Sequence, residues 1–423
     1  MYFEIDSGIR ENEELTMLRE QTHKFAAEVI RPAAKELDQM EPRKVAQKDS
    51  PYFDVMKQMK KMGYHRMQVL KEHGGLELTP DEIHIINEEL GWGSVGLTTA
   101  IGVDSIPLAM ASLAGSPELI EEVVRPWMED TEGKYHGCWP VMEEAHGSDY
   151  VIGMSYPYPE EFGNKGFVTA DRDGDGWVIN GAKSYWTSSA PCANYAFLIV
   201  NLPPHRSIAD IGGCIVPLTL PGVTQGPPID KLGLRDDPQG ELAFDNVRIP
   251  AHYMLLAEPV FGRFATKGVI SSTSCGMACM FTGLARAAFE EALKYTRERV
   301  QGGRPLIEHD VVKLKLSDMF LKVETARYFT RVVLRHVSER SRALTFDQST
   351  AHALSAQVYA TNIAYEVAHQ SRQLHGANGL TKDYLIEKLY RDATAGLMED
   401  GANEALSLEA AYSFLEEGRY TTE

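Results

Sequence analysis

The spacing of apolar side chains changes twice along this chain of 423 residues, from helical to strand-like and back to helical. From Glu13 to about Leu119 apolar residues recur at intervals of three and four, as at Leu18, Phe25 and Val29. This spacing is typical of helices that bury one face. The first third of the chain is therefore predicted to be a helical domain.

The middle of the chain, from about Tyr135 to Pro250, has a different pattern. Short runs rich in β-branched and aromatic residues, such as FVTADR, YAFLIV, GCIVPL and ELAFDNVRI, are separated by Gly, Pro and Asp turns. Such runs are typical of strands joined by tight connections. We expect a small β domain here, shaped like a barrel or a sandwich.

Helical spacing returns from about Phe261 and lasts longer. Apolar stripes run along 281–299 and 312–333, and two further helices are expected before the end of the chain. Four such helices favour an antiparallel bundle. The predicted fold class is α+β, with an N-terminal helical domain at 1–134, a middle β domain at 135–258 and a C-terminal four-helix bundle at 259–423. Three domains suit a chain longer than one core usually supports.

Charge and hydropathy exclude several classes of protein. The net charge of -18 argues against a nucleic-acid or anionic-membrane binder, since either needs a basic face. The N-terminus is acidic, and no later run comes near the roughly 18 apolar residues that a membrane span needs. We therefore expect a cytoplasmic protein that binds neither nucleic acid nor membrane.

Neither the cysteines nor the acidic runs predict a metal site. The five cysteines contain no CxxC pair, as expected for reduced thiols. The run DRDGDG (171–176) matches the first half of a calcium loop, but Ala182 stands where the closing glutamate must be. A β-hairpin turn is predicted there instead.

Three segments resemble the acyl-CoA dehydrogenase superfamily, and the first is VMEEAHGSD (141–149). It resembles the family's flavin loop, with Glu143 and the GSD sequence in register. Met142 stands where a hydroxyl residue is usual. The resemblance implies that Met142 and Ser148 contact FAD and that Ser148 also contacts the substrate.

The second segment, WVINGAKSYWTSSA (177–190), resembles the family's stretch beside the flavin ring. By that register Tyr185 takes the place of the ring-packing tryptophan, and Thr187 that of the hydroxyl near flavin N5. The alternative is an ordinary hairpin in which NGAK forms the turn and Trp186 belongs to the core.

The third segment begins with GLARAAFEEALKYTRERVQGGRPLIEH (283–309), which resembles the first two bundle helices of the family. Arg299 then takes the place of the cation for the FAD pyrophosphate, usually that of a neighbouring subunit; a solvated helix end is the alternative. The run QLHGANG (373–379) resembles the loop that receives the adenosine half. The resemblance implies FAD contacts for the following residues: Arg299, Gln301, Gln373, Ala377, Ala402 and Glu404.

The segment ends at the expected catalytic turn, Met398-Glu-Asp-Gly-Ala402. The family places its catalytic glutamate directly before a glycine, so the corresponding base here is Asp400, with Gly401 beside the substrate. One branch of the family carries its glutamate on an earlier helix, but the matching run SSTSCG (271–276) has no carboxylate. Asp400 is therefore the predicted base.

Asp104 lies in the apolar run TTAIGVDSIPLA, where the family lines its acyl pocket. The resemblance allows Asp104 to bind a polar acyl group or to accept a second proton. A place on the solvated surface, or a helix N-cap, is the alternative.

Three functions follow from the resemblance. The first is FAD-dependent dehydrogenation of an atypical or cyclic acyl-CoA by a homotetramer that passes electrons to a partner such as an electron-transferring flavoprotein. The second is a flavin oxidase like nitroalkane oxidase, which also carries an aspartate at this position but has an arginine where this chain has Ser407. The third is a binding protein that has kept the fold without redox chemistry.

Overall fold

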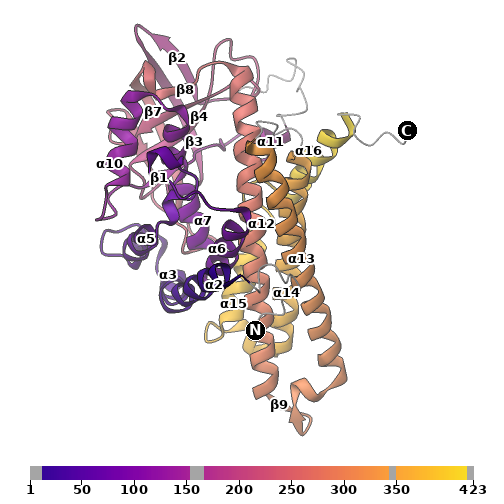
Figure 1. Cartoon of the computed structure of the whole chain (residues 1–423). Coiled ribbons are helices and arrows are strands. Elements are labelled where there is room, and N and C mark those ends of the chain that lie inside the picture. Colours follow the sequence, from indigo (N-terminus) through magenta and orange to yellow (C-terminus); the bar gives the residue numbers. More distant parts are fainter. Residues whose placement is uncertain (1–11, 153–165, 343–348, 417–423) are drawn as a thin grey trace.

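The computed structural model of the chain describes residues 12–152, 166–342 and 349–416, and it has helices at both ends of the sequence and strands in the middle (Figure 1). Among these residues every strand except one short hairpin lies between Gly137 and Leu256. The predicted α+β class and the order of its three parts are confirmed.

The first part consists of short helices whose ends have clear sequence causes. Thr79 accepts a hydrogen bond from the backbone N–H of Glu82, whose carboxylate bonds back to the Thr79 N–H, so this capping box starts α6. The segments are α2 Glu13–Phe25, η1 Ala26–Ile30, α3 Arg31–Gln39, α4 Pro42–Val45, α5 Pro51–Lys61, η2 Tyr64–Arg66, η3 Lys71–His73, α6 Pro80–Gly93, α7 Val95–Asp104, α8 Ile106–Ala114, α9 Pro117–Leu119, η4 Ile120–Val124 and α10 Arg125–Met128. The short helix α11 Asp149–Ile152 follows β1 in the middle part.

The middle part is a mixed sheet of eight strands. Its order is β6-β7-β3-β2-β4-β5-β8, and β1 pairs with β4. The strands are β1 Gly137–Cys138, β2 Thr169–Asp173, β3 Gly176–Ser188, β4 Tyr195–Asn201, β5 Ile211–Pro217, β6 Val223–Gln225, β7 Gln239–Pro250 and β8 Met254–Leu256. A two-residue turn, Gly174-Asp175, joins β2 to β3 with a positive φ at Gly174, so the predicted hairpin is confirmed.

The sheet is open within the described residues, so the barrel that was one of the two expected shapes does not close. Two antiparallel groups, β6-β7-β3-β2 and β4-β5-β8, are joined only by the parallel pair Thr169 and Asn201, and β6 and β8 remain the two ends. Alternation of side chains predicts strands, but closure depends on which strands pair at the edges.

Long helices form the last part of the chain. They are α12 Pro259–Glu298, α13 Asp310–Arg342, α14 Thr350–His375, α15 Leu385–Ala395 and α16 Asn403–Glu416, with the small hairpin β9 Val300–Gln301 and β10 Arg304–Pro305 and the turns η6 Ala251–Tyr253, η7 Leu306–Glu308 and η9 Gly376–Leu380. Helix α14 packs against α12, α13 and α16. Figure 1 shows these helices side by side, with α12 running the height of the molecule.

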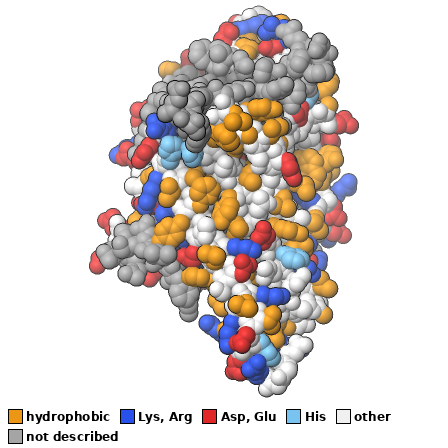
Figure 2. Space-filling view, turned by 90° about the vertical axis from the view of Figure 1, so that its right-hand side faces the viewer, with side chains coloured by type: hydrophobic (Ala, Val, Ile, Leu, Met, Phe, Trp, Pro, Cys, Tyr) orange, Lys and Arg blue, Asp and Glu red, His pale blue; other side chains and the backbone are white. Residues whose placement is uncertain are grey.

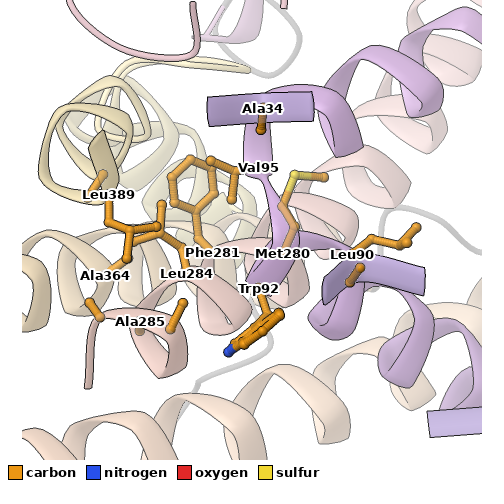
Figure 3. Close-up of a cluster of buried hydrophobic side chains, with 14 of the residues drawn as sticks. Ala34, Leu90, Trp92, Val95, Met280, Phe281, Leu284, Ala285, Ala364 and Leu389 are labelled. Atoms are coloured by element: carbon orange, nitrogen blue, oxygen red, sulfur yellow. The ribbon is translucent and has the colours of Figure 1, made fainter. Parts of the chain in front are cut away.

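A buried apolar cluster joins the first and last parts (Figure 3). Glycines let α6 and α12 approach closely, since a Cβ at Gly91 would lie 2.2 Å from the Met280 carbonyl oxygen and one at Gly283 would lie 2.0 Å from that of Glu88. Side chains labelled in Figure 3 are Ala34, Leu90, Trp92 and Val95 from the first part and Met280, Phe281, Leu284, Ala285, Ala364 and Leu389 from the last. The two helical parts therefore share one core.

Two helical stretches, Val95–Ala114 and Ala265–Glu298, are long and apolar enough to cross a membrane by length and composition alone. The expectation that no run comes near this hydropathy is therefore wrong. In each stretch 78% of the most apolar window is buried inside the protein. Burial in a protein core produces the same composition as burial in lipid.

Candidate active site

A cavity of about 1100 Å³ lies where the helical parts meet the sheet. Its walls come from α7, α12, β3, the loop at 139–150 and the turn between α15 and α16. The residues that line it include Thr99, Ile101, Gly102, Val103, Ser105, Met142, Ser148, Ser184, Trp186, Ser188, Lys231, Thr273, Gly276, Met277, Met280, Glu399, Asp400 and Gly401. Its size suits a ligand larger than a single amino acid.

The turn between α15 and α16 brings the predicted base to the flavin loop. Asp400 has a φ of 56° and Gly401 a φ of 104°, so two successive residues are left-handed. The next backbone N–H, that of Ala402, donates to the Ser148 hydroxyl at 2.9 Å. Ser148, Asp400 and Gly401 all line the cavity, whereas Glu404 is exposed in the first turn of α16.

The Asp400 carboxyl group faces the cavity with spare hydrogen-bonding capacity. Its Oδ2 is enclosed and has no hydrogen-bond partner in the part of the chain that the structure describes. Burial raises the pKa of Asp400 to about 7, and the charge of Glu399 adds to this rise. The hydrogen bond from Thr273 acts in the opposite direction and lowers the pKa. A carboxylate with such a pKa can act as a base near neutral pH.

Glu399, by contrast, is held by side chains from distant elements. Gln239 Nε2 donates to Glu399 Oε1 at 3.1 Å and to the Ser188 hydroxyl at 3.1 Å, while Lys231 Nζ donates to Gln239 Oε1 at 2.6 Å. Gln357 Nε2 also donates to the Glu399 carbonyl oxygen at 3.0 Å. We call these five residues the base-turn network. Its hydrogen bonds fix the residue directly before Asp400.

A second buried acid stands behind this network. The Ser188 hydroxyl donates to Asp237 Oδ2 at 2.7 Å, and Asp237 Oδ1 has no hydrogen-bond partner among the described residues. Burial raises the pKa of Asp237 to about 7, although Lys231 opposes the rise. Sequence reasoning missed Asp237 and Gln239, since nothing in their local sequence indicates that they lie beside residue 399.

The flavin loop is fastened to the sheet by a buried ion pair. Lys183 Nζ lies 2.8 Å from Glu143 Oε1, and the same carboxylate accepts hydrogen bonds from the backbone N–H groups of Phe167 and Val168. A buried carboxylate satisfied on both oxygens is held in one orientation. The loop therefore holds Met142, which lines the cavity, in a fixed position.

Strand β3 presents different residues to the cavity from those expected. Of the described residues of β3, Ser184, Trp186 and Ser188 line the cavity, and Tyr185 and Thr187 do not. Successive strand side chains point to opposite faces, and an irregularity between Lys183 and Thr187 changes the pairing with β7 there. Trp186 is 52% exposed, so the alternative in which it belongs to the core is wrong. Contact of Tyr185 and Thr187 with FAD stays a prediction.

Asp104 lies in a buried ion-pair cluster instead of the predicted substrate site. Its carboxylate lies 3.0 Å from Lys60 Nζ and 2.8 Å from His136 Nδ1, and these partners lower its pKa although burial works in the opposite direction. Among described residues the cavity is lined by the neighbours Val103 and Ser105 but not by Asp104. Asp104 is neither on the surface nor a cap, because it is fully buried and Ser105 is the N-cap of α8.

The predicted pyrophosphate and adenosine contacts lie outside this cavity. Arg299 is the C-cap of α12, about 35 Å along the helix from Gly276 at about 1.5 Å per residue. Gln301 follows it in β9, and Gln373 and Ala377 are exposed at the end of α14. These residues cannot reach a ligand in the cavity of the same subunit. Contact with a neighbouring subunit's FAD stays a prediction.

The side chains that line the cavity include an aromatic ring and a hydroxyl group that suit a flavin. Trp186 presents a half-exposed aromatic surface, and the Ser184 hydroxyl is enclosed there without a hydrogen-bond partner in the described residues. A planar heteroaromatic ring can stack on the first and accept a hydrogen bond from the second. Met142, Ser148 and Trp186 would hold such a ring in the cavity that Asp400 also lines.

Family models match three successive parts of the chain. They are described as the acyl-CoA dehydrogenase N-terminal domain, matching residues 12–131, the middle domain, matching 143–247, and the C-terminal domain, matching 264–413. The mitochondrial short-chain specific acyl-CoA dehydrogenase of Homo sapiens is 30% identical over 397 residues, 92% of this chain and 89% of that protein. Its counterpart from Bos taurus is 29% identical over 95% of this chain and 90% of that protein.

Solved structures of the same kind share the fold. Butyryl-CoA dehydrogenase from Megasphaera elsdenii superposes with a TM-score of 0.80 at 21% identity, covering 98% of this chain and 100% of that one. A glutaryl-CoA dehydrogenase from Mycobacterium smegmatis in complex with FADH2 gives 0.80 at 21% identity and 98% coverage of both chains. At these identities the likeness extends to the fold.

Proposed function

This chain belongs to the acyl-CoA dehydrogenase family of FAD-dependent oxidoreductases acting on CH–CH bonds, and from this premise we propose that Asp400 is the base with which it oxidises an atypical acyl-CoA. The observation that carries the proposal is the contrast between two adjacent acids. Glu399 is engaged by Gln239, whereas Asp400 Oδ2 faces the cavity without a partner in the described residues.

The residues around Asp400 suit proton abstraction next to a thioester. Asp400 takes the proton from the α carbon, and the backbone N–H of Asp400 donates to the thioester oxygen, on which negative charge develops. FAD, when bound, supplies the acceptor for the hydride that leaves the β carbon. The enclosed position of Asp400 excludes water from the carboxylate while the proton is held.

The length of the base supports an atypical substrate. Aspartate is one methylene shorter than glutamate, so its carboxylate lies further from a straight acyl chain that occupies the usual position. A displacement of about 1 Å can cost on the order of a hundredfold in rate. We therefore propose an acyl group that brings its α carbon nearer to the turn, such as a branched or cyclic group.

Reduction of bound FAD tests the proposal directly. Purified protein is mixed without oxygen with straight-chain, branched and cyclic thioesters, and we expect at least one branched or cyclic thioester to bleach the flavin. An electron-transferring flavoprotein, or a dye in its place, should then reoxidise it. Failure of every thioester to bleach a yellow preparation would overturn the proposed function.

The same experiment separates the oxidase alternative. A flavin oxidase like nitroalkane oxidase would bleach with a nitroalkane and produce hydrogen peroxide in air without any dye. Against this alternative, the Ser407 hydroxyl donates to the Asn403 carbonyl oxygen at 2.7 Å within α16, so it does not replace a cation in the site. We expect no bleaching by nitroalkanes.

A further inference from the structure

Two glycines stand inside neighbouring helices that line the cavity. Gly102 belongs to α7 and Gly276 to α12, and both line the cavity. Glycine within a helix lowers helix stability relative to alanine, because it gains more freedom in the unfolded chain. A reason is therefore needed for glycine at each position.

Neither backbone geometry nor packing supplies that reason. Gly102 and Gly276 are not among the glycines with positive φ, so alanine could adopt both conformations. A Cβ added at either glycine would meet no heavy atom within 4 Å in the described residues. At Gly96, by contrast, the Cβ would lie 2.3 Å from Asp236 Oδ1, and at Gly283 it would lie 2.0 Å from the Glu88 carbonyl oxygen. Those two helical glycines are required by packing.

Both glycines lie on the side of the cavity nearer to the sheet. Helices α7 and α12 touch where the Thr99 hydroxyl lies 3.5 Å from Met280 Sδ. The end of α7 contacts β1, since a Cβ at Gly137 would lie 2.3 Å from the Asp104 carbonyl oxygen. The beginning of α12 contacts β5, since a Cβ at Gly262 would lie 1.9 Å from the Ile211 carbonyl oxygen, so the two helices run in opposite directions from the Thr99 contact. Gly102 follows Thr99 and Gly276 precedes Met280, which places both between this contact and the sheet.

Asp400 adjoins the same space. Thr273, one helical turn before Gly276, is a hydrogen-bond partner of the Asp400 carboxyl group. The enclosed Asp400 Oδ2 has no hydrogen-bond partner in the described part of the chain. The empty volume beside Gly276 is therefore next to the atom that would take the proton. The immediate sequence neighbours of the two glycines that also line the cavity are apolar: Ile101, Val103 and Met277. Ser105, Ser272 and Thr273 line it within a turn of the same helices.

We infer that Gly102 and Gly276 are specificity-determining residues, which keep the cavity wide beside Asp400 for a hydrocarbon acyl group that is branched or cyclic at its α and β carbons. The inference rests on the proposed function. A straight acyl chain has no atoms at its sides to fill the space of two missing methyl groups. A branched or cyclic group fills that space with apolar contacts.

Alanine variants test the inference with two readouts that move in opposite directions. Gly102→Ala and Gly276→Ala should raise Tm, because alanine favours the helix. Each should lower kcat/KM by about tenfold or more for the best branched or cyclic thioester, since one extra carbon in a pocket discriminates on this scale. With butyryl-CoA the value should stay unchanged or rise, and FAD absorbance per chain should not change.

Gly283→Ala on the same helix is the matched control. Its added Cβ would collide with the Glu88 backbone, so it should lower Tm without changing the ratio of the two kcat/KM values. If the alanine variants lost kcat/KM equally on straight and branched thioesters, so that the ratio of the two kcat/KM values stayed unchanged, the inference would be overturned. The proposed function would still stand. Wild-type protein that is reduced by no thioester would overturn both.

Discussion

At the scale of single residues, the two acids Glu399 and Asp400 should respond differently to loss of charge. Asp400→Asn should bind FAD and substrate but slow flavin reduction by a factor of about 100 to 10,000, because the required base is lost. Glu399→Gln keeps a side chain that can form a hydrogen bond with Gln239, so its rate of flavin reduction should fall only modestly. Anaerobic stopped-flow reduction with the best thioester measures both.

The opposite result would place the base one residue earlier. If Glu399→Gln is inactive while Asp400→Asn turns over normally, the alignment of the turn is wrong. Asp400→Glu gives an intermediate test, since the longer side chain restores the usual base of the family. We expect it to lose activity on a branched or cyclic thioester and to gain some on straight-chain ones.

The pH dependence of flavin reduction follows from the raised pKa of Asp400. Burial raises this pKa to about 7, and only the ionised carboxylate can take a proton. The rate should therefore rise as the pH increases through about 7 and then level off. In Asp400→Asn the same step should be absent. Stopped-flow traces from pH 5 to 9 measure the profile, and a step that survives in the variant would assign it to another group.

Gln239 is expected to act on the base through Glu399. Gln239→Leu removes the hydrogen bond to the Glu399 carboxylate and should lower kcat with little change in KM, because the turn is no longer fixed for the reaction. Gln225 is a suitable control, since its Nε2 donates to the carbonyl oxygens of Ala190 and Ala193 and it does not line the cavity in the described part of the chain. If Gln225→Leu lowered kcat and KM together and Gln239→Leu did not lower kcat, the role assigned to Gln239 would be contradicted.

At the scale of elements, the far end of α12 should matter for a cofactor that it cannot reach within its own subunit. Arg299→Ala should lower FAD content, because its guanidinium is predicted to pair with the pyrophosphate of a neighbouring subunit's FAD. Arg304 on the adjacent strand β10 is exposed as well, and Arg304→Ala serves as the charge-matched control. Unchanged FAD content and assembly in Arg299→Ala would contradict the role.

The elements also show how far sequence reasoning extends. Helical spacing and strand alternation predicted the α–β–α order and the β2–β3 hairpin, because both depend on near neighbours. The family resemblance assigned Tyr185 to the flavin ring, whereas an irregular pairing of β3 with β7 brings Trp186 to the cavity. The resemblance also assigned Asp104 to the acyl pocket. Its partner Lys60 comes from α5, and a buried ion pair of this kind leaves no pattern in the local sequence.

At the scale of the whole molecule, the C-terminal helical part has apolar side chains exposed on its surface. Figure 2 shows them among charged groups on the face that the long C-terminal helices form. Exposed apolar residues of α13 are Val311, Leu314, Leu321 and Val332.

Dilution of a homotetramer that shares FAD between subunits should release flavin together with subunits. Light scattering with flavin fluorescence measures both, and a monodisperse monomer that retains FAD would contradict the shared site.

The left-handed backbone at Asp400 has a consequence for laboratory evolution. A residue other than glycine in this conformation carries a strain of about 1 kcal/mol or more, which asparagine or glycine would reduce. Selection for heat resistance alone should therefore favour replacing the base. The same selection should favour alanine at Gly102 and Gly276. Libraries screened only for survival at high temperature would accumulate inactive proteins, so a turnover screen has to accompany each round.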